Sequence, residues 1–165
     1  MEQEIGMLEF GKDIDDIEKP QLLPEDFYLF EVSGTPKTQK NREMEKNPSS
    51  EKAGYNWVVP LRTIGADTPQ FNGRMFTAYL PLPKPEDNNE YDGRGQKIYD
   101  AKMDRIAKFI TAAGGQIAGK TAMLAPGSKL GLHVVQQVNP RTQELGNSLD
   151  IFGEFKTAEA MGWKD

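Results

Sequence analysis

The stretch YNWVVPLRTI, Tyr55–Ile64, carries the strongest strand signal in this chain of 165 residues. Aromatic and β-branched side chains fill it, and such residues favour the extended backbone of a sheet. Pro60 lacks a backbone donor, so we expect a bend or a sheet edge at that position. A second alternating run, Arg74–Leu80, follows Asn72-Gly73, a pair that is typical of a tight turn. Together the two runs predict an antiparallel hairpin.

Three more strands and one helix are expected around this hairpin. The strands are Phe27–Val32 before it, and Lys129–Val138 and Ser148–Phe155 after it. The helix, at about Gln96–Ala113, has an apolar stripe at helical spacing that includes Met103.

One helix between the third and fourth of five strands is the element order of the OB-fold, a Greek-key barrel. We therefore predict a mainly β fold, an OB-fold-like β-barrel over residues 23–156. An acidic N-terminal arm (1–22) precedes it and a C-terminal tail (157–165) follows it.

The composition suits one folded domain, with 27% charged and 37% apolar residues in separated blocks. No apolar run reaches the ~20 residues of a membrane span, and the first residues lack the features of a signal peptide. These features predict a cytoplasmic protein without a membrane partner. The absence of cysteine excludes disulfides, thiolate nucleophiles and cysteine-based zinc sites.

The net charge of −5 is concentrated at one end of the chain. Residues 1–20 hold seven acidic residues and two lysines, so the other 145 residues are balanced at 18 basic and 18 acidic. Polyanion binding depends on local charge, so a neutral body can still present a basic face. The total charge therefore does not exclude a nucleic-acid ligand.

Two features indicate a surface for a nucleic-acid strand. The segment Ser33–Gly54 is almost free of apolar residues and rich in cations, and it joins the first two strands, where an OB-fold borders its ligand groove. The hairpin beyond it supplies five aromatic rings, of which we expect about three to be buried. Exposed rings stack on bases while cations follow phosphates. The residues predicted to bind nucleic acid are Lys37, Lys40, Arg42, Lys46, Lys52, Tyr55, Trp57, Arg62, Phe71, Arg74, Phe76, Tyr79, Lys129 and Arg141.

Gly114–Thr121 matches the P-loop pattern G-x-x-x-x-G-K-[ST], which would predict binding of a nucleoside triphosphate. A P-loop follows a buried strand and opens a helix. Here a helix precedes the motif, and Pro126-Gly127 would end any helix after it. We expect a helix cap and a linker, with Lys120 exposed.

No recognisable spacing of residues predicts a catalytic site. His133 is the only histidine, and no Ser–His–Asp set or metal cluster can be placed. We expect no enzymatic activity, no cofactor and no metal.

The path from Leu23–Tyr28 through Tyr55-Asn56-Trp57, Phe71–Arg74 and Gly119-Lys120 to the last hairpin resembles a group of small bacteriophage proteins from replication and recombination clusters. That group is similar to phage single-stranded DNA-binding proteins, and the resemblance covers about residues 22–156. It implies an OB-type fold, a non-enzymatic role in coating single-stranded DNA with low sequence specificity, and partners among replication or recombination proteins in the host cytoplasm. The chain is also a candidate for forming a homo-oligomer.

Many such proteins carry their acidic tail at the C-terminus, whereas this chain carries its acid at the front. Met161 and Trp163 are candidates for a short docking element in the nearly neutral tail.

Two other functions fit the same residues. An OB-type protein–protein interaction module without nucleic-acid binding predicts an apolar, uncharged groove. A P-loop protein predicts activity that depends on Lys120.

Overall fold

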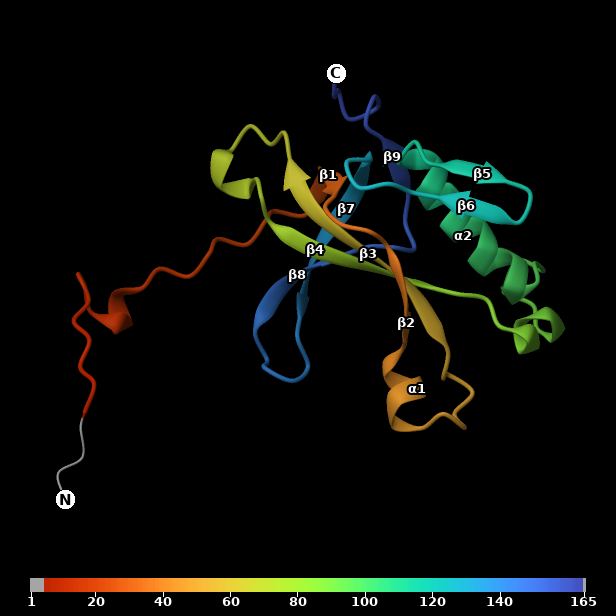
Figure 1. Ribbon diagram of the computed structural model, residues 1–165, viewed down its shortest axis with the longest axis horizontal. Coiled ribbons are helices and arrows are strands. Elements are labelled where there is room, and N and C mark those ends of the chain that lie inside the picture. The colour runs from red at the N-terminus through yellow and green to blue at the C-terminus, as the bar shows by residue number, and fades with distance from the viewer. Residues whose placement is uncertain (1–4, 165) are drawn as a thin grey trace.

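The computed structural model describes residues 5–164, which form a mainly β fold with antiparallel strands (Figure 1). The seven strands of the main sheet are β1 (Asp26–Val32), β2 (Lys37–Lys40), β3 (Tyr55–Ile64), β4 (Met75–Pro81), β7 (Lys129–Val138), β8 (Leu145–Leu149) and β9 (Phe155–Thr157). The remaining elements are the hairpin of β5 (Gln116–Ala118) and β6 (Thr121–Met123), the helices α1 (Arg42–Lys46) and α2 (Ile98–Ala112), and the 3-10 turns η1 (Ile14–Asp16), η2 (Pro69–Phe71) and η3 (Pro85–Asn89).

Strand β3 is the common partner of β1, β2 and β4. On one edge of β3, β2 pairs with the first half of the strand and β1 with the second half. On the other edge, β4 pairs with β3 along most of its length. The break between β1 and β2 lies opposite Pro60, which cannot donate to a ladder, and the Ser33 N–H donates to the Pro60 carbonyl at 3.0 Å. Of the two alternatives predicted at Pro60, the structure shows the local sheet edge, since the ladder on that side of β3 is interrupted there.

The prediction of one continuous strand over Ser148–Phe155 is wrong in the middle of that range. β8 pairs with Val134–Val138 and β9 pairs with Leu130–Leu132, but residues 150–154 form no ladder. The Asp150 side chain accepts a hydrogen bond from the Phe152 N–H at 3.2 Å, which turns the chain out of the sheet. The prediction missed this turn because the apolar residues on both sides continue the strand pattern.

The sheet does not close into a barrel within the described residues. Closure would require a ladder between β4 and β8, and the recorded pairs of β4 are all with β3. The mainly β class is as predicted. The predicted strands lie before and after α2 in the expected order, but the described chain has four strands before α2 and five after it, and the closed barrel is not observed.

Two segments predicted as loop or linker contain regular structure. The segment Ser33–Gly54 contains β2 and α1, and the Asn41 side chain caps α1 by accepting from the Met44 N–H at 2.9 Å. Neither element buries an apolar stripe, so periodicity could not reveal it.

The second segment is Gly114–Thr121, which matches the P-loop pattern. α2 ends in a Schellman motif at Gly114, whose φ is +77°, and the following residues form the β5–β6 hairpin. The described chain has no helix after Lys120, so the amide cradle that a P-loop needs is missing.

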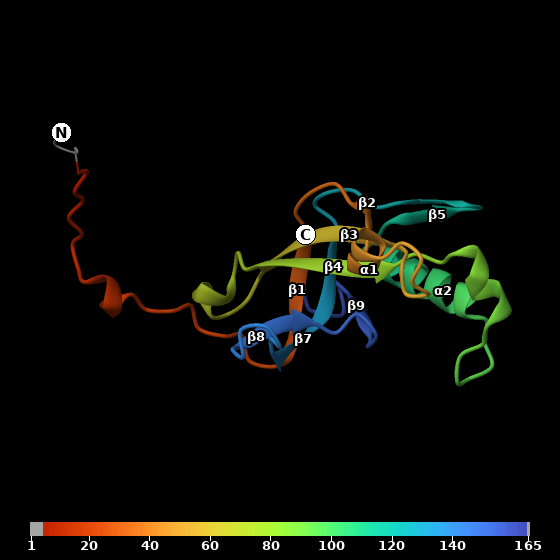
Figure 2. The same cartoon turned by 90° about the horizontal axis from the view of Figure 1, so that it is seen from below.

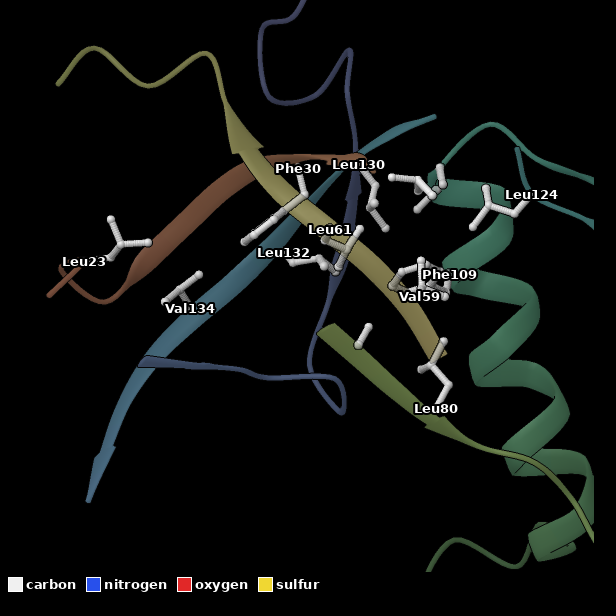
Figure 3. Close-up of a cluster of buried hydrophobic side chains, with 14 residues drawn as sticks. Leu23, Phe30, Val59, Leu61, Leu80, Phe109, Leu124, Leu130, Leu132 and Val134 are labelled. Carbon is white, nitrogen blue, oxygen red and sulfur yellow. The ribbon is translucent and has the colours of Figure 1, made fainter. Parts of the chain in front are cut away.

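The core lies between the inward rows of the strands and α2 (Figure 3). Its labelled members are Leu23, Phe30, Val59, Leu61, Leu80, Phe109, Leu124, Leu130, Leu132 and Val134, all buried. Phe109 joins the helix to the sheet, because its ring meets the edge of Trp57 at 6.3 Å and of Phe155 at 5.4 Å between centroids. Met103, predicted on the same apolar stripe, is 52% exposed. The face of α2 toward the body instead includes Lys102 and Arg105, which make polar contacts.

The segments before β1 and after β9 behave differently. Residues 5–20 are exposed and extend away from the sheet (Figures 1 and 2), while residues 1–4, with Glu2 and Glu4 of the predicted arm, lie outside the described residues.

The C-terminal tail folds back on its own sheet. A Cβ at Gly131 would lie 2.6 Å from Met161, and Lys129 Nζ lies 5.5 Å from the centre of the Trp163 ring. Both candidate docking residues are thus half-buried against the same molecule.

Replacement of Phe109 with alanine tests the junction between helix and sheet. We expect Phe109→Ala to lower the free energy of unfolding by about 3–5 kcal/mol, since it removes a buried ring and leaves a cavity. Met103→Ala, on the exposed face of the same helix, should change it by less than about 0.5 kcal/mol. Chemical denaturation measures both, and equal losses would contradict this account of the core.

Candidate nucleic-acid interface

Side-chain alternation divides the β3–β4 hairpin into two faces. On β3 the odd positions from Trp57 to Thr63 point into the core, and on β4 the even positions do. Thr63 is fully buried, and its hydroxyl donates to the Phe71 carbonyl at 2.6 Å and accepts from the Arg74 N–H at 2.9 Å. The opposite positions form the outer surface.

We define the β3–β4 outer face by the outward residues of β2, β3 and β4 that the register places side by side. Lys37, Val58 and Tyr79 form one cross-strand row. Arg62 and Met75 form a second row, and Thr77 lies on β4 between the two. Neighbours across a ladder have Cβ atoms about 4.5–5.5 Å apart. The face therefore carries one exposed ring, two apolar side chains and two cations.

Of the five predicted aromatic residues, three lie against the core and two toward solvent. Trp57, Phe71 and Phe76 pack on the core. Tyr79 is 51% exposed on the outer face, and Tyr55 is 44% exposed. Tyr55 shares the inward side of β3 with Trp57, but it stands at the end of the strand beyond the core.

The predicted cations do not form one cluster. Lys40, on β2, is exposed, and so are Arg42 and Lys46 on α1, Lys52 in the turn after it, and Arg141 between β7 and β8. Two others are engaged locally. Arg74 Nε donates to the Gln70 carbonyl at 3.0 Å, and Lys129 Nζ donates to the Gly127 carbonyl at 3.1 Å.

One carboxylate lies beside the outer face. Glu31 pairs in register with Arg62 on one side and with Lys129 on the other, and its Oε1 lies 3.2 Å from Arg62 Nη2. Arg62 remains half exposed in this pair. A single acid between two cations leaves this part of the face with a positive balance.

A groove of about 1010 Å³ beside Tyr55 is a second candidate surface. Its lining carries Glu51, Glu86, Glu90 and the buried Asp87 against two lysines, Lys52 and Lys84. Carboxylates repel phosphates, so the groove suits a polyanion less well than the β3–β4 outer face does.

A buried ionic network fixes one wall of this groove. Asp87 Oδ2 accepts from Lys102 Nζ at 2.8 Å and from the Lys84 N–H at 3.0 Å. Lys84 Nζ in turn donates to the carbonyls of Glu51 and Ala53, the latter at 3.0 Å. The network joins η3, α2 and the segment after α1.

The charge of Asp87 is maintained by these partners. Burial alone would raise the pKa of its carboxyl, but the hydrogen bonds from Lys102 and the Lys84 N–H, together with both lysine charges, hold that pKa below its usual value.

Sequence reasoning missed Val58, Met75 and the Asp87 network. The first two are ordinary apolar strand residues, and only the register shows that they surround Tyr79 and Arg62. Asp87 lies among several acids of a polar loop, and nothing in the sequence distinguishes the one that is buried.

Residues 5–164 show neither a metal cluster nor a membrane-spanning helix. No group of three or more His, Cys, Asp or Glu residues in this range could hold a metal ion, and none of its helices has the length and apolar character needed to cross a membrane. Neither a protein-family model nor a curated protein matches the sequence.

Asp87→Asn tests the ionic network. We expect it to lower the free energy of unfolding at pH 7 by about 1–3 kcal/mol, less than for a fully buried pair because the Lys102 side chain is 28% exposed. Asp100→Asn, at an exposed position of α2, is the matched control and should have little effect.

The same variant predicts a pH dependence. A carboxylate whose pKa is lowered by folding stabilises the fold above the unfolded pKa of about 3.9, and this contribution disappears as the pH falls through the folded value. The difference between the native chain and Asp87→Asn should shrink when denaturation is measured at pH 3 instead of pH 7. A constant difference would mean that the carboxylate charge contributes nothing.

Proposed function

We propose that this protein is a non-enzymatic single-stranded DNA-binding protein that coats the strand with low sequence specificity during phage replication or recombination. The strand lies across the β3–β4 outer face. Exposed cations of β2, β3, α1 and the neighbouring loops hold its phosphates.

The observation that carries the proposal is the cross-strand row of Lys37, Val58 and Tyr79. It puts a half-exposed ring next to an apolar side chain, with an exposed lysine on the other side of that side chain. A base can stack on the ring while its phosphate approaches the cation, a combination that is indifferent to sequence.

An OB-type fold supports the same function. β1 with β2 and β8 with β9 each act as one interrupted long strand, which with β3, β4 and β7 makes five strands with α2 between the third and the fourth. In OB-folds, ligands bind on the face of the second and third strands, which here correspond to β3 and β4. The proposed strand path therefore lies on the strands that correspond to the ligand face of an OB-fold.

The two competing functions are less well supported. A protein interaction module was expected to have an uncharged groove, whereas Lys37 and Arg62 border the apolar residues of the outer face. A P-loop needs a helix that begins at its lysine, whereas Lys120 lies in the turn of the β5–β6 hairpin.

Tyr79→Ala tests base stacking. Loss of the ring should weaken binding of a labelled single-stranded oligonucleotide by about 1–3 kcal/mol, which is about 5- to 150-fold in Kd. Fluorescence anisotropy measures it, with duplex DNA of the same sequence as the weaker competitor. Tyr91→Ala removes another exposed tyrosine, outside the outer face, and should leave the affinity unchanged. Equal effects of the two substitutions would reject the outer face as the binding surface.

The double variant Lys37→Gln, Arg62→Gln tests the phosphate contacts. Each contact removed should reduce the slope of log K against log salt concentration by about 0.7, because fewer counterions are released. The slope comes from the same titration repeated at several salt concentrations. Lys120→Gln is the control, since it removes an exposed cation on the β5–β6 hairpin. An unchanged slope in the double variant, or a loss of binding in the control, would contradict the proposed path.

A further inference from the structure

The N-terminal arm, residues 5–20, starts from a firmly anchored root. Leu23 is fully buried, and its N–H donates to the Asn147 side chain at 2.8 Å. Its carbonyl accepts from Asn147 Nδ2 and Gln136 Nε2, both at 2.9 Å. Both backbone groups of Leu23 are thus bound by side chains of β7 and β8, which fixes the place where the arm leaves the body.

Beyond this root the arm is exposed throughout and projects away from the body (Figure 2). Six large apolar side chains in it are 60–87% exposed: Ile5, Met7, Leu8, Phe10, Ile14 and Ile17. Its one recorded ion pair, Lys19 with Glu144 at 4.0 Å, is between highly exposed side chains and is weak in solvent. Apolar groups gathered in one exposed segment mark a binding element.

The chemistry of the arm matches the β3–β4 outer face. Its apolar residues alternate with acids, and residues 5–20 hold five carboxylates against two lysines. The outer face presents Val58, Met75 and Tyr79 beside Lys37 and Arg62, which complement both properties. The exposed apolar residues Ile117 and Met123 of the β5–β6 hairpin form a poorer match, because Lys120 is the one cation within that hairpin.

The root directs the arm toward another molecule. Pro20 and Pro24 each restrict the residue before them to extended conformations, so Lys19 and Leu23 resist a reversal of the chain. Sixteen extended residues span about 50 Å, which is ample to cross to a neighbouring molecule.

We infer that the arm of one molecule binds the β3–β4 outer face of a second copy of this chain. Reciprocal exchange of two arms closes a two-fold dimer. Because that face is the one assigned to the DNA strand, the arm and the strand compete for it. This competition rests on the proposed function, whereas the association of two copies does not.

Sedimentation equilibrium of the full chain, without nucleic acid, tests the association. The native mass should rise with concentration from 18.5 kDa to about twice that value. An arm variant (Leu8→Ser, Phe10→Ser, Ile14→Ser) and a face variant (Met75→Ser, Tyr79→Ser) should each remain monomeric. Because every altered residue is exposed in the single chain, both should unfold thermally like the native chain at concentrations where the native chain is also monomeric. A hairpin variant (Ile117→Ser, Met123→Ser) is the matched control and should associate like the native chain.

Mixing the arm variant with the face variant gives the decisive measurement. One keeps an intact face and the other an intact arm, so the mixture should form a one-to-one pair that neither forms alone. A native chain that stays monomeric, a mixture that does not pair, or an arm variant that still associates would each overturn the inference.

Binding of single-stranded oligonucleotide separates this inference from the proposed function. The arm variant should bind the oligonucleotide more tightly than the native chain, since it has lost the competitor. Association through the arm without any DNA binding would reject the proposed function and retain the inference. A third outcome is that the native chain stays monomeric while the arm variant binds DNA more tightly than it does. The arm would then cover the outer face of its own molecule, and binding to a second copy would be rejected.

Discussion

The ladder position of β3 is the constraint on which the rest of this structure depends. It is hydrogen-bonded to β1, β2 and β4, so its alternation fixes which side of three neighbouring strands faces the core. A shift of one residue would exchange Leu61 and Arg62 and turn the apolar row to solvent. The core and the β3–β4 outer face are therefore two consequences of one register.

The buried polar groups have a more local task. Thr63 ties the end of β3 to the turn before β4, and Asp87 joins η3 to α2 through Lys102. Each satisfies its hydrogen bonds, which is the condition for placing such groups among apolar neighbours. They position the segments around the sheet, while the apolar rows supply the burial.

Strong periodic signals made most of the fold predictable. β3 and β7 have the predicted bounds, β1 and β4 differ from them by single residues, and Gly114 ends α2 as expected. The prediction was wrong where chain contacts at long range or polar turns decide the backbone. β2, α1 and the β5–β6 hairpin bury no apolar stripe, and the Asp150 turn interrupts an apparently continuous strand.

The amino-acid sequence by itself determined the mainly β class, the order of strands around one helix, the absence of cysteine chemistry and the separation of an acidic end from a neutral body. Local periodicity and composition carry these properties. The tertiary structure alone decided that Tyr79 is exposed while Trp57, Phe71 and Phe76 pack on the core, that Asp87 is the buried acid among residues 5–164, and that no ladder joins β4 to β8. These depend on which strand lies beside which, a relation between residues far apart in the chain.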